Sequence, residues 1–218
     1  MAFFYLYNMK YRSFTLIEII FILILLSIIL TFTIPSNQLS KIDLAKEQLI
    51  SHLKYTRYIA MLDNKYYYYS DDLWYKKLWN MKFLNCNKDV GGIYYVIYSN
   101  TINPNRWNIS KKETLIDPFT NNYIYSSSKC EQDSLYDKSK YVLLSNYYDI
   151  KDIKISCNDT SSLGQIYFDN NGSAYSYIDN DHSKFIDNKI KNNCIITLID
   201  SNNNERNITI EAYTGYIY

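Results

Sequence analysis

A long apolar run near the start of the chain constrains the fold more than any other feature. Residues 14–34 contain no Lys, Arg or Asp, and Glu18 is their only formally charged residue. At 1.5 Å rise per residue, a helix over this run is roughly 31 Å long, about the thickness of the hydrocarbon core of a bilayer. A carboxylate at mid-membrane costs on the order of 2.5–3.5 kcal/mol, and less near an end of the helix. The run therefore predicts a transmembrane helix with one functional acid, Glu18, near its start.

The composition limits what the rest of the chain can form. The chain has 218 residues, which leaves room for one membrane segment and one domain of ordinary size. Its formal net charge is +1, so nothing indicates a surface for a polyanion or a strongly acidic partner. Tyr and Ile are abundant after the apolar run, which favours a β-rich core.

All four cysteines, Cys86, Cys130, Cys157 and Cys194, follow the apolar run. None belongs to a CxxC pair or lies near a histidine at ligand spacing, which argues against a zinc site. An even number of cysteines in an exported domain indicates two disulfides with three possible connectivities, and buried free thiols are the alternative. Proximity along the chain favours the pairs Cys86–Cys130 and Cys157–Cys194.

Three interpretations compete for the beginning of the chain. A secretory signal peptide needs small residues at a cut after the apolar core, and residues 31–35 fit this poorly. A plain signal anchor accounts for the apolar run but gives Glu18 no role. A cut between Ser13 and Phe14 retains the helix and leaves a free amine on Phe14, one helical turn from Glu18. An amine and a carboxylate attract strongly in a low dielectric, within one subunit or between neighbours.

Residues 13–18, with the sequence S-F-T-L-I-E, resemble the cleavage and methylation motif of type IV prepilins and the related pseudopilins. The resemblance implies that a prepilin peptidase cuts before Phe14 and methylates the new N-terminus. It also implies that Glu18 is needed for filament assembly. Pro35 falls where the family often has a helix-bending proline. The chain departs from the family at Ser13, where the family usually has Gly.

The third interpretation divides the chain into a leader peptide at residues 1–13, a transmembrane and assembly helix at residues 14–35, and a domain at residues 36–218. Leaders of the family are usually short and basic, so we predict that Met9 is the true start. Lys10 and Arg12 then hold the N-terminus in the cytoplasm by the positive-inside rule. The predicted location is the bacterial inner membrane, crossed once, with the C-terminal domain in the periplasm.

Residues 36–62 predict an amphipathic helix that continues after the apolar run. Apolar residues recur at three- and four-residue spacing, with Thr56 filling one position. The positions on this face are Leu39, Ile42, Ala45, Leu49, Leu53 and Ala60. The pattern is that of a helix packed on a sheet, and residues 49–60 also resemble the second half of the long helix in minor pseudopilins.

Strand signals follow the amphipathic helix, although most of residues 64–140 are hard to place. Residues 92–99 alternate as a strand does. Two hairpins are indicated by turn residues at 169–172 and at 200–204. In the last strand Ile208, Ile210 and Ala212 share one face, which predicts a sheet with one buried face. The sequence thus predicts an α+β fold in which one long N-terminal helix, transmembrane in its first half and amphipathic in its second, packs on a small antiparallel sheet.

No catalytic constellation is present in the sequence, so no enzyme activity, cofactor or metal is predicted. His52 and His182 lie far apart in the sequence with no nucleophile motif near either, and each is predicted to be a surface or packed histidine. Residues 117–123 resemble the Asp-Pro-aromatic loop of major pseudopilins, near which that family binds calcium. A simple Asp-Pro turn at Asp117 is the alternative.

The function that the resemblance implies is structural. We expect a pseudopilin of a type II secretion system, whose partners are other pilin-like subunits, the prepilin peptidase, the inner-membrane assembly platform and the membrane. A minor pilin of a type IV pilus or competence system is the alternative. Gly215 is followed by Tyr216, Ile217 and Tyr218, without the basic Gly-Arg pattern of some uptake pilins, which argues against nucleic-acid binding. A membrane-anchored domain that does not assemble is the remaining possibility.

Overall fold

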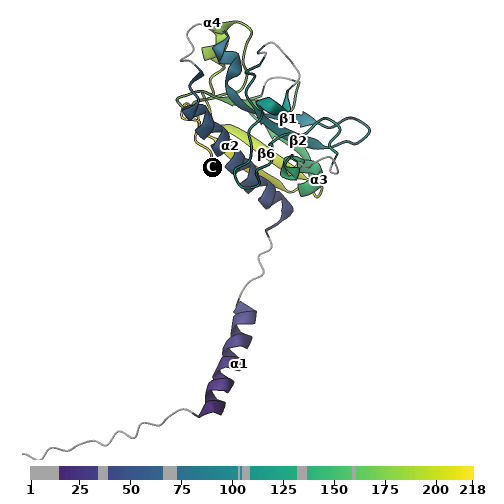
Figure 1. Ribbon diagram of the computed structural model, residues 1–218, viewed down its shortest axis with the longest axis vertical. Coiled ribbons are helices and arrows are strands. Elements are labelled where there is room, and N and C mark those ends of the chain that lie inside the picture. The colour runs from purple at the N-terminus through teal and green to yellow at the C-terminus, as the bar shows by residue number, and fades with distance from the viewer. Residues whose placement is uncertain are drawn as a thin grey trace, which may run out of the picture. The chain divides into compact units, whose positions relative to one another are not determined.

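The computed structural model describes residues 15–33, 39–65, 73–102, 104, 109–131, 137–158 and 161–218. The chain divides into two compact units, Met1–Gln38 and Leu39–Tyr218, and each is described by itself. Figure 1 shows helix α1 as the labelled element of the first unit, and the other labelled helices and strands belong to the second.

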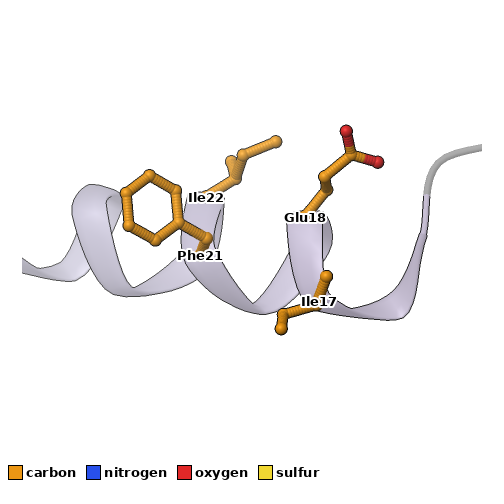
Figure 2. Close-up of a pocket in the computed structure, with 4 residues that line it drawn as sticks. All are labelled: Ile17, Glu18, Phe21 and Ile22. Carbon is orange, nitrogen blue, oxygen red and sulfur yellow. The ribbon is translucent and has the colours of Figure 1, made fainter.

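Helix α1 covers Leu16–Thr33 and consists of apolar residues apart from Glu18, Ser27, Thr31 and Thr33. Glu18 lies in its first turn (Figure 2). Its 18 residues span about 27 Å at 1.5 Å per residue, less than the roughly 30 Å hydrocarbon core of a bilayer. Within the described part of the chain, no helix has both the length and the apolar character needed to cross a membrane. The predicted transmembrane half of the helix is therefore wrong, and so is the predicted single-pass location in the inner membrane.

Helix α2 spans Lys41–Leu62 and opens the second unit. The side chain of Ser40 caps it by accepting a hydrogen bond from the backbone N–H of Asp43. One face of the helix is buried, and it consists of Ile42, Ala45, Leu49, His52, Leu53, Thr56 and Ala60. The predicted face is confirmed except at Leu39, which precedes the helix and is 59% exposed. Residues 34–38, including Pro35, lie outside the described residues.

Four strands form the first antiparallel sheet, in the order β2-β1-β4-β5. The central pair is β1 (Trp79–Asn85) and β4 (Gln165–Phe168), flanked by β2 (Ile93–Tyr98) and the short β5 (Ala174–Tyr175). Strand β2 confirms the strand predicted at residues 92–99, and β4 and β5 form the hairpin predicted around residues 169–172. Strand β1 has no counterpart among the predicted strands.

The second antiparallel sheet has the order β3-β6-β7. Strands β6 (Cys194–Asp200) and β7 (Glu205–Ile210) form the predicted hairpin, and β3 (Ile150–Ile155) pairs with the other edge of β6. The prediction of a single small sheet is therefore wrong. Neither β1 nor β3 was predicted, and the pairing of these two strands determines which sheet each neighbouring strand joins.

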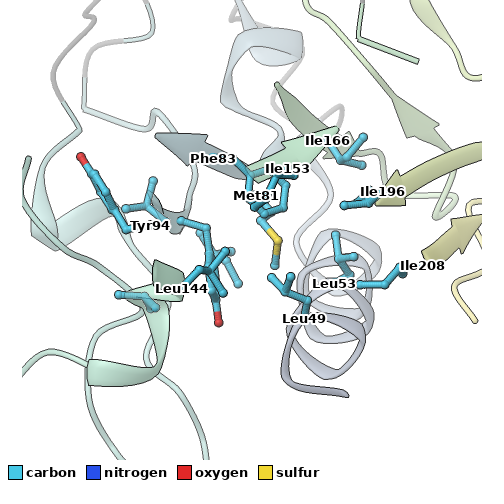
Figure 3. Packing of buried hydrophobic residues seen from close by; sticks show 14 of the residues in the cluster. Leu49, Leu53, Met81, Phe83, Tyr94, Leu144, Ile153, Ile166, Ile196 and Ile208 are labelled. Atoms are coloured by element: carbon cyan, nitrogen blue, oxygen red, sulfur yellow. The ribbon is translucent and has the colours of Figure 1, made fainter. Parts of the chain in front are cut away.

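The core lies between α2 and the strands of both sheets. Figure 3 shows Leu49 and Leu53 of α2 pointing toward Met81 of β1, with Ile196 of β6 and Ile208 of β7 beside them. All five side chains are completely buried. Burying an apolar side chain of this size stabilises the fold by about 1.5–3 kcal/mol. The apolar stripe of α2 thus holds the two sheets together.

Short helices fill the connections between the strands. They are η2 (Trp74–Lys77), η3 (Lys111–Glu113), η4 (Lys140–Val142), α3 (Leu144–Tyr148), α4 (His182–Phe185) and η5 (Ile186–Asn188). A second, smaller cluster of buried residues forms where η2 meets α4, and the rings of Tyr175 and Phe185 stack there at a centroid distance of 4.5 Å. This cluster supports one end of the first sheet.

Candidate functional site

Glu18 and Thr15 form a capping box at the start of α1. The backbone N–H and the hydroxyl of Thr15 each donate a hydrogen bond to Oε2 of Glu18, both at 2.9 Å. The backbone N–H of Glu18 in turn donates to Oγ1 of Thr15 at 3.4 Å. This arrangement satisfies N–H groups that the first turn of a helix otherwise leaves without partners. The sequence signal for it is Thr-x-x-Glu before an apolar run, and these residues lie within the segment that resembles the prepilin motif.

The same contacts favour the charged form of Glu18. The hydrogen bond from the backbone of Thr15, followed by the one from its hydroxyl, lowers the pKa of the Glu18 carboxyl below its ordinary value. A carboxylate in the first turn also interacts favourably with the positive end of the helix dipole. Glu18 is therefore an ionised carboxylate on an exposed surface.

The surface around Glu18 is apolar and uncovered. Ile17, Phe21 and Ile22 border the carboxylate and form a shallow hollow with it (Figure 2). The large apolar side chains between residues 16 and 29 are 44–79% exposed. An apolar surface of this extent marks a site of interaction, because leaving it in water is unfavourable. The first unit thus presents an apolar helix with a single acid at its start.

The other residues predicted for processing have no described structure. Ser13 and Phe14, the predicted cleavage site and methylated residue, lie outside the described residues, as do Lys10 and Arg12. The leader peptide, the cut and the methylation remain predictions from the sequence.

Both predicted disulfides are present in the second unit. Cys86, just after β1, pairs with Cys130, and Cys157, just after β3, pairs with Cys194, the first residue of β6. These are the pairs that proximity along the chain favoured. The second bridge closes one end of the β3–β6 strand pair, and the first ties the end of β1 to the long connection before α3.

His52 is a packed histidine in the core. Its Nδ1 lies 2.7 Å from the hydroxyl of Tyr95 in β2, and its Nε2 lies 3.0 Å from Nε2 of Gln48. The carboxylate of Asp117 is 3.9 Å from Nε2. Burial lowers the pKa of His52 to about 4, although the negative charge of Asp117 acts in the opposite direction. The imidazole is therefore neutral at pH 7 and serves the packing of α2 on the first sheet.

His182 has a different environment from His52. It is exposed at the start of α4, where its ring lies 5.7 Å from the ring of Trp74 and 5.0 Å from that of Tyr75, centroid to centroid. These contacts make it part of an aromatic surface cluster. Each histidine was predicted to be either packed or on the surface. His52 is packed in the core and His182 is on the surface.

Asp117 organises the turn that contains Pro118. Its Oδ1 accepts a hydrogen bond from the backbone N–H of Phe119, and its Oδ2 accepts one from the hydroxyl of Thr120, each at 2.9 Å. These are the contacts by which an Asp side chain stabilises a turn. Across the residues with described positions, no group of three or more His, Cys, Asp or Glu residues is arranged to hold a metal ion. Both oxygens of Asp117 serve the turn itself.

The C-terminus returns to the second sheet. Thr209 of β7 and Tyr218 exchange two backbone hydrogen bonds, of 2.8 and 3.0 Å. The side chain of Ile217 is buried, whereas those of Tyr216 and Tyr218 are more than half exposed. The end of the chain therefore presents tyrosine rings rather than basic side chains.

Comparison of this chain with protein-family models, with curated proteins and with solved structures gives no match.

Proposed function

We propose that the chain is a structural subunit that assembles into a filament through helix α1, as a pseudopilin of a type II protein secretion system. The observation that carries the proposal is the surface of α1, which is apolar and exposed on every side and bears one ionised carboxylate in its first turn. The sequence resemblance of residues 13–18 to prepilins supports the same function.

Packing of α1 against the same helix of neighbouring subunits accounts for its apolar surface. Each Å² of apolar surface removed from water contributes about 25 cal/mol, so helices that are apolar on all sides associate strongly with one another. An isolated carboxylate inside such a bundle is unfavourable unless a cation pairs with it. A free amine on Phe14 of a neighbouring subunit would supply that cation, and it exists only after the bond between Ser13 and Phe14 is cut.

The near-neutral charge of the chain and its lack of basic residues at positions 216–218 favour secretion over DNA uptake. The formal net charge of the chain is +1, and the C-terminal residues Tyr216, Ile217 and Tyr218 carry no positive side chain. Affinity for nucleic acid depends mainly on Lys and Arg contacts with phosphate groups. Salt-dependent binding of duplex DNA by the purified chain would support a minor pilin of a DNA-uptake system instead.

The test compares three substitutions that separate the charge of Glu18 from its role in the capping box. Glu18→Gln retains a hydrogen-bond acceptor for Thr15 but removes the charge, Glu18→Ala removes both, and Thr15→Val removes the capping hydroxyl but leaves the carboxylate. We expect both Glu18 variants to lose crosslinks between sister subunits in the producing cell, whereas Thr15→Val retains them. Equal loss in Glu18→Gln and Thr15→Val would show that Glu18 acts only as a helix cap.

Mass spectrometry of the native chain provides the second test. We expect an N-terminal peptide that begins with a methylated Phe14. A native chain with an intact bond between Ser13 and Phe14, together with an absence of crosslinks between wild-type subunits, would contradict the filament function.

A further inference from the structure

A polar cavity lies on the face of the first sheet opposite the core. In the paired strands β1 and β4, Met81 and Ile166 point into the core and are completely buried. Because side chains alternate along a strand, the next register pair, Lys82 and Gln165, points to the other face. There these two residues line a cavity of about 310 Å³.

Among the described residues, Lys82 has a cationic side chain without a partner. It is partly buried in the central strand β1 and forms no hydrogen bond or ion pair with any residue whose position is described. Burial lowers the pKa of its ammonium group, and no carboxylate of the described residues offsets this effect. An ammonium group that is partly removed from water without a counter-ion is unfavourable, so an anion that enters the cavity gains a preformed partner.

Gln165 supplies a hydrogen-bond acceptor beside this cation. Its side-chain oxygen Oε1 is buried and accepts no hydrogen bond from the described residues. Buried polar atoms of native proteins are nearly always paired, and an exception needs an explanation. A ligand with a hydroxyl or N–H group would pair this oxygen.

Three tyrosines form the walls of the cavity. Tyr98 and Tyr167 come from β2 and β4, and Tyr177 lies at the rim, 39% exposed. Burial raises the pKa of Tyr98 to about 12 and that of Tyr167 well above its ordinary value, so both hydroxyls are neutral. The tyrosines therefore line the cavity with rings that a ligand can contact and add no charge to it.

The rim of the cavity is held in place by hydrogen bonds to Asn180. The ammonium group of Lys76 donates to its Oδ1 at 3.1 Å, and the hydroxyl of Tyr75 donates to its backbone oxygen at 2.7 Å. Lys76 therefore adds a second positive charge at the opening. A site whose walls and rim are already positioned loses little conformational entropy when it binds.

We propose that this cavity binds a small hydroxylated carboxylate of the uronic acid class. Lys82 pairs with the carboxylate, Oε1 of Gln165 accepts a hydrogen bond from a ring hydroxyl, and the tyrosines contact the sugar ring. An anion without a hydroxyl or N–H group, such as acetate, leaves Gln165 unpaired, and a neutral sugar leaves Lys82 unpaired. Only a ligand with both a negative charge and hydrogen-bond donors satisfies the two groups together, and pockets of this volume suit small molecules.

The test uses the full chain, kept in a non-ionic detergent because of the exposed apolar surface of α1. Isothermal titration calorimetry measures the binding of galacturonate and glucuronate, with galactose and acetate as comparison ligands. We expect at least one uronate to bind at least tenfold more tightly than galactose and acetate. A chain that binds neither uronate, or that binds acetate as tightly, would overturn the proposal.

Substitutions assign the binding to the cavity. Lys82→Met removes the cation and keeps the length of the side chain, and we expect at least a tenfold loss of uronate affinity. Lys154→Met is the matched control, because Lys154 is an exposed lysine of β3 in the other sheet, and it should bind as the wild type does. Gln165→Met, a second cavity variant, covers the case in which Lys82→Met does not fold. Unchanged affinity in a folded cavity variant would overturn the proposed site.

Discussion

The hydroxyl of Tyr95 in β2 lies 2.7 Å from Nδ1 of His52 in α2, inside the core of the second unit. Tyr95 is completely buried and His52 is 3% exposed. Burial raises the pKa of Tyr95 and lowers the pKa of His52 to about 4, so both partners are neutral near pH 7. A neutral polar pair thus joins helix α2 to β2, an edge strand of the first sheet, and the neutrality of the pair depends on pH.

The stability of the chain should fall in mild acid because of His52. Its pKa is about 4 in the folded chain and 6.5 ordinarily, so the unfolded state binds the proton more readily. The neutral imidazole contributes fully to the free energy of unfolding above pH 6.5, and this contribution is lost as the pH falls toward 4. The difference amounts to about 3 kcal/mol in the free energy of unfolding. Urea denaturation between pH 7 and 4.5 measures it, with His52→Gln as the control that should lose this part of the pH dependence. Parallel curves for both proteins would contradict the assignment.

Arg57 should stabilise the chain by joining α2 to two distant segments. Its Nε donates to the backbone oxygen of Gly172 at 2.9 Å, and its Nη2 donates to that of Thr214 at 3.1 Å. We expect Arg57→Met to lower the free energy of unfolding by about 2 kcal/mol, because hydrogen bonds from a charged group are lost. Arg57→Lys should recover only part of this, since one ammonium group lacks the planar fork of the guanidinium.

The control for Arg57 is Lys46→Met on the same helix. Lys46 is partly exposed, and its removal should change the free energy of unfolding by less than about 0.5 kcal/mol. Chemical denaturation of the three variants measures the differences. Equal effects of Arg57→Met and Lys46→Met would show that the two contacts of Arg57 contribute nothing.

Gly215 should tolerate a side chain far less well than Gly91. Both have a positive φ, +65° and +67°, which costs a residue with a Cβ atom about 1–2 kcal/mol. A Cβ on Gly215 would also lie 2.2 Å from the backbone oxygen of Gly172, whereas a Cβ on Gly91 meets no atom within 4 Å. Gly91→Ala therefore reports the backbone cost alone, and Gly215→Ala should destabilise the fold by at least about 1 kcal/mol more. Similar midpoints of denaturation for the two variants would contradict the close approach of Gly215 to Gly172.

The two disulfides should contribute nearly equally to stability. They join residues 44 and 37 positions apart, and the chain-entropy model assigns about 4 kcal/mol to loops of either length. The paired substitutions Cys86→Ala with Cys130→Ala and Cys157→Ala with Cys194→Ala remove one bridge each. Thermal denaturation under oxidising conditions compares them. A much larger loss for one pair would show that its bridge also supports native packing, beyond its constraint on the unfolded chain.

Local patterns predicted the elements whose partners lie nearby in the sequence. The buried face of α2, strand β2 and both hairpins follow from apolar periodicity and turn residues, because each signal is complete within a short segment. The pairing of Cys86 with Cys130 agrees with simple proximity. The Thr-x-x-Glu spacing of Thr15 and Glu18 is also a local signal for a capping box, although none was predicted there.

Tertiary structure decided the features that depend on distant partners. Strand β1 lies at the centre of a sheet because it pairs with β2 and β4, and its own residues give no clear period to indicate this. The cavity near Lys82 exists because Gln165 lies across the β1–β4 register from it.

By itself, the sequence determined an apolar, acid-bearing helix near the start of the chain and an amphipathic helix with antiparallel hairpins after it. Only the tertiary structure decided that the strands form two sheets and that Lys82 faces a polar cavity. The physical reason is that hydrophobic periodicity is a local property of the chain. Helix ends, strand order and the pairing of buried charges depend on the free energy of contacts between distant segments.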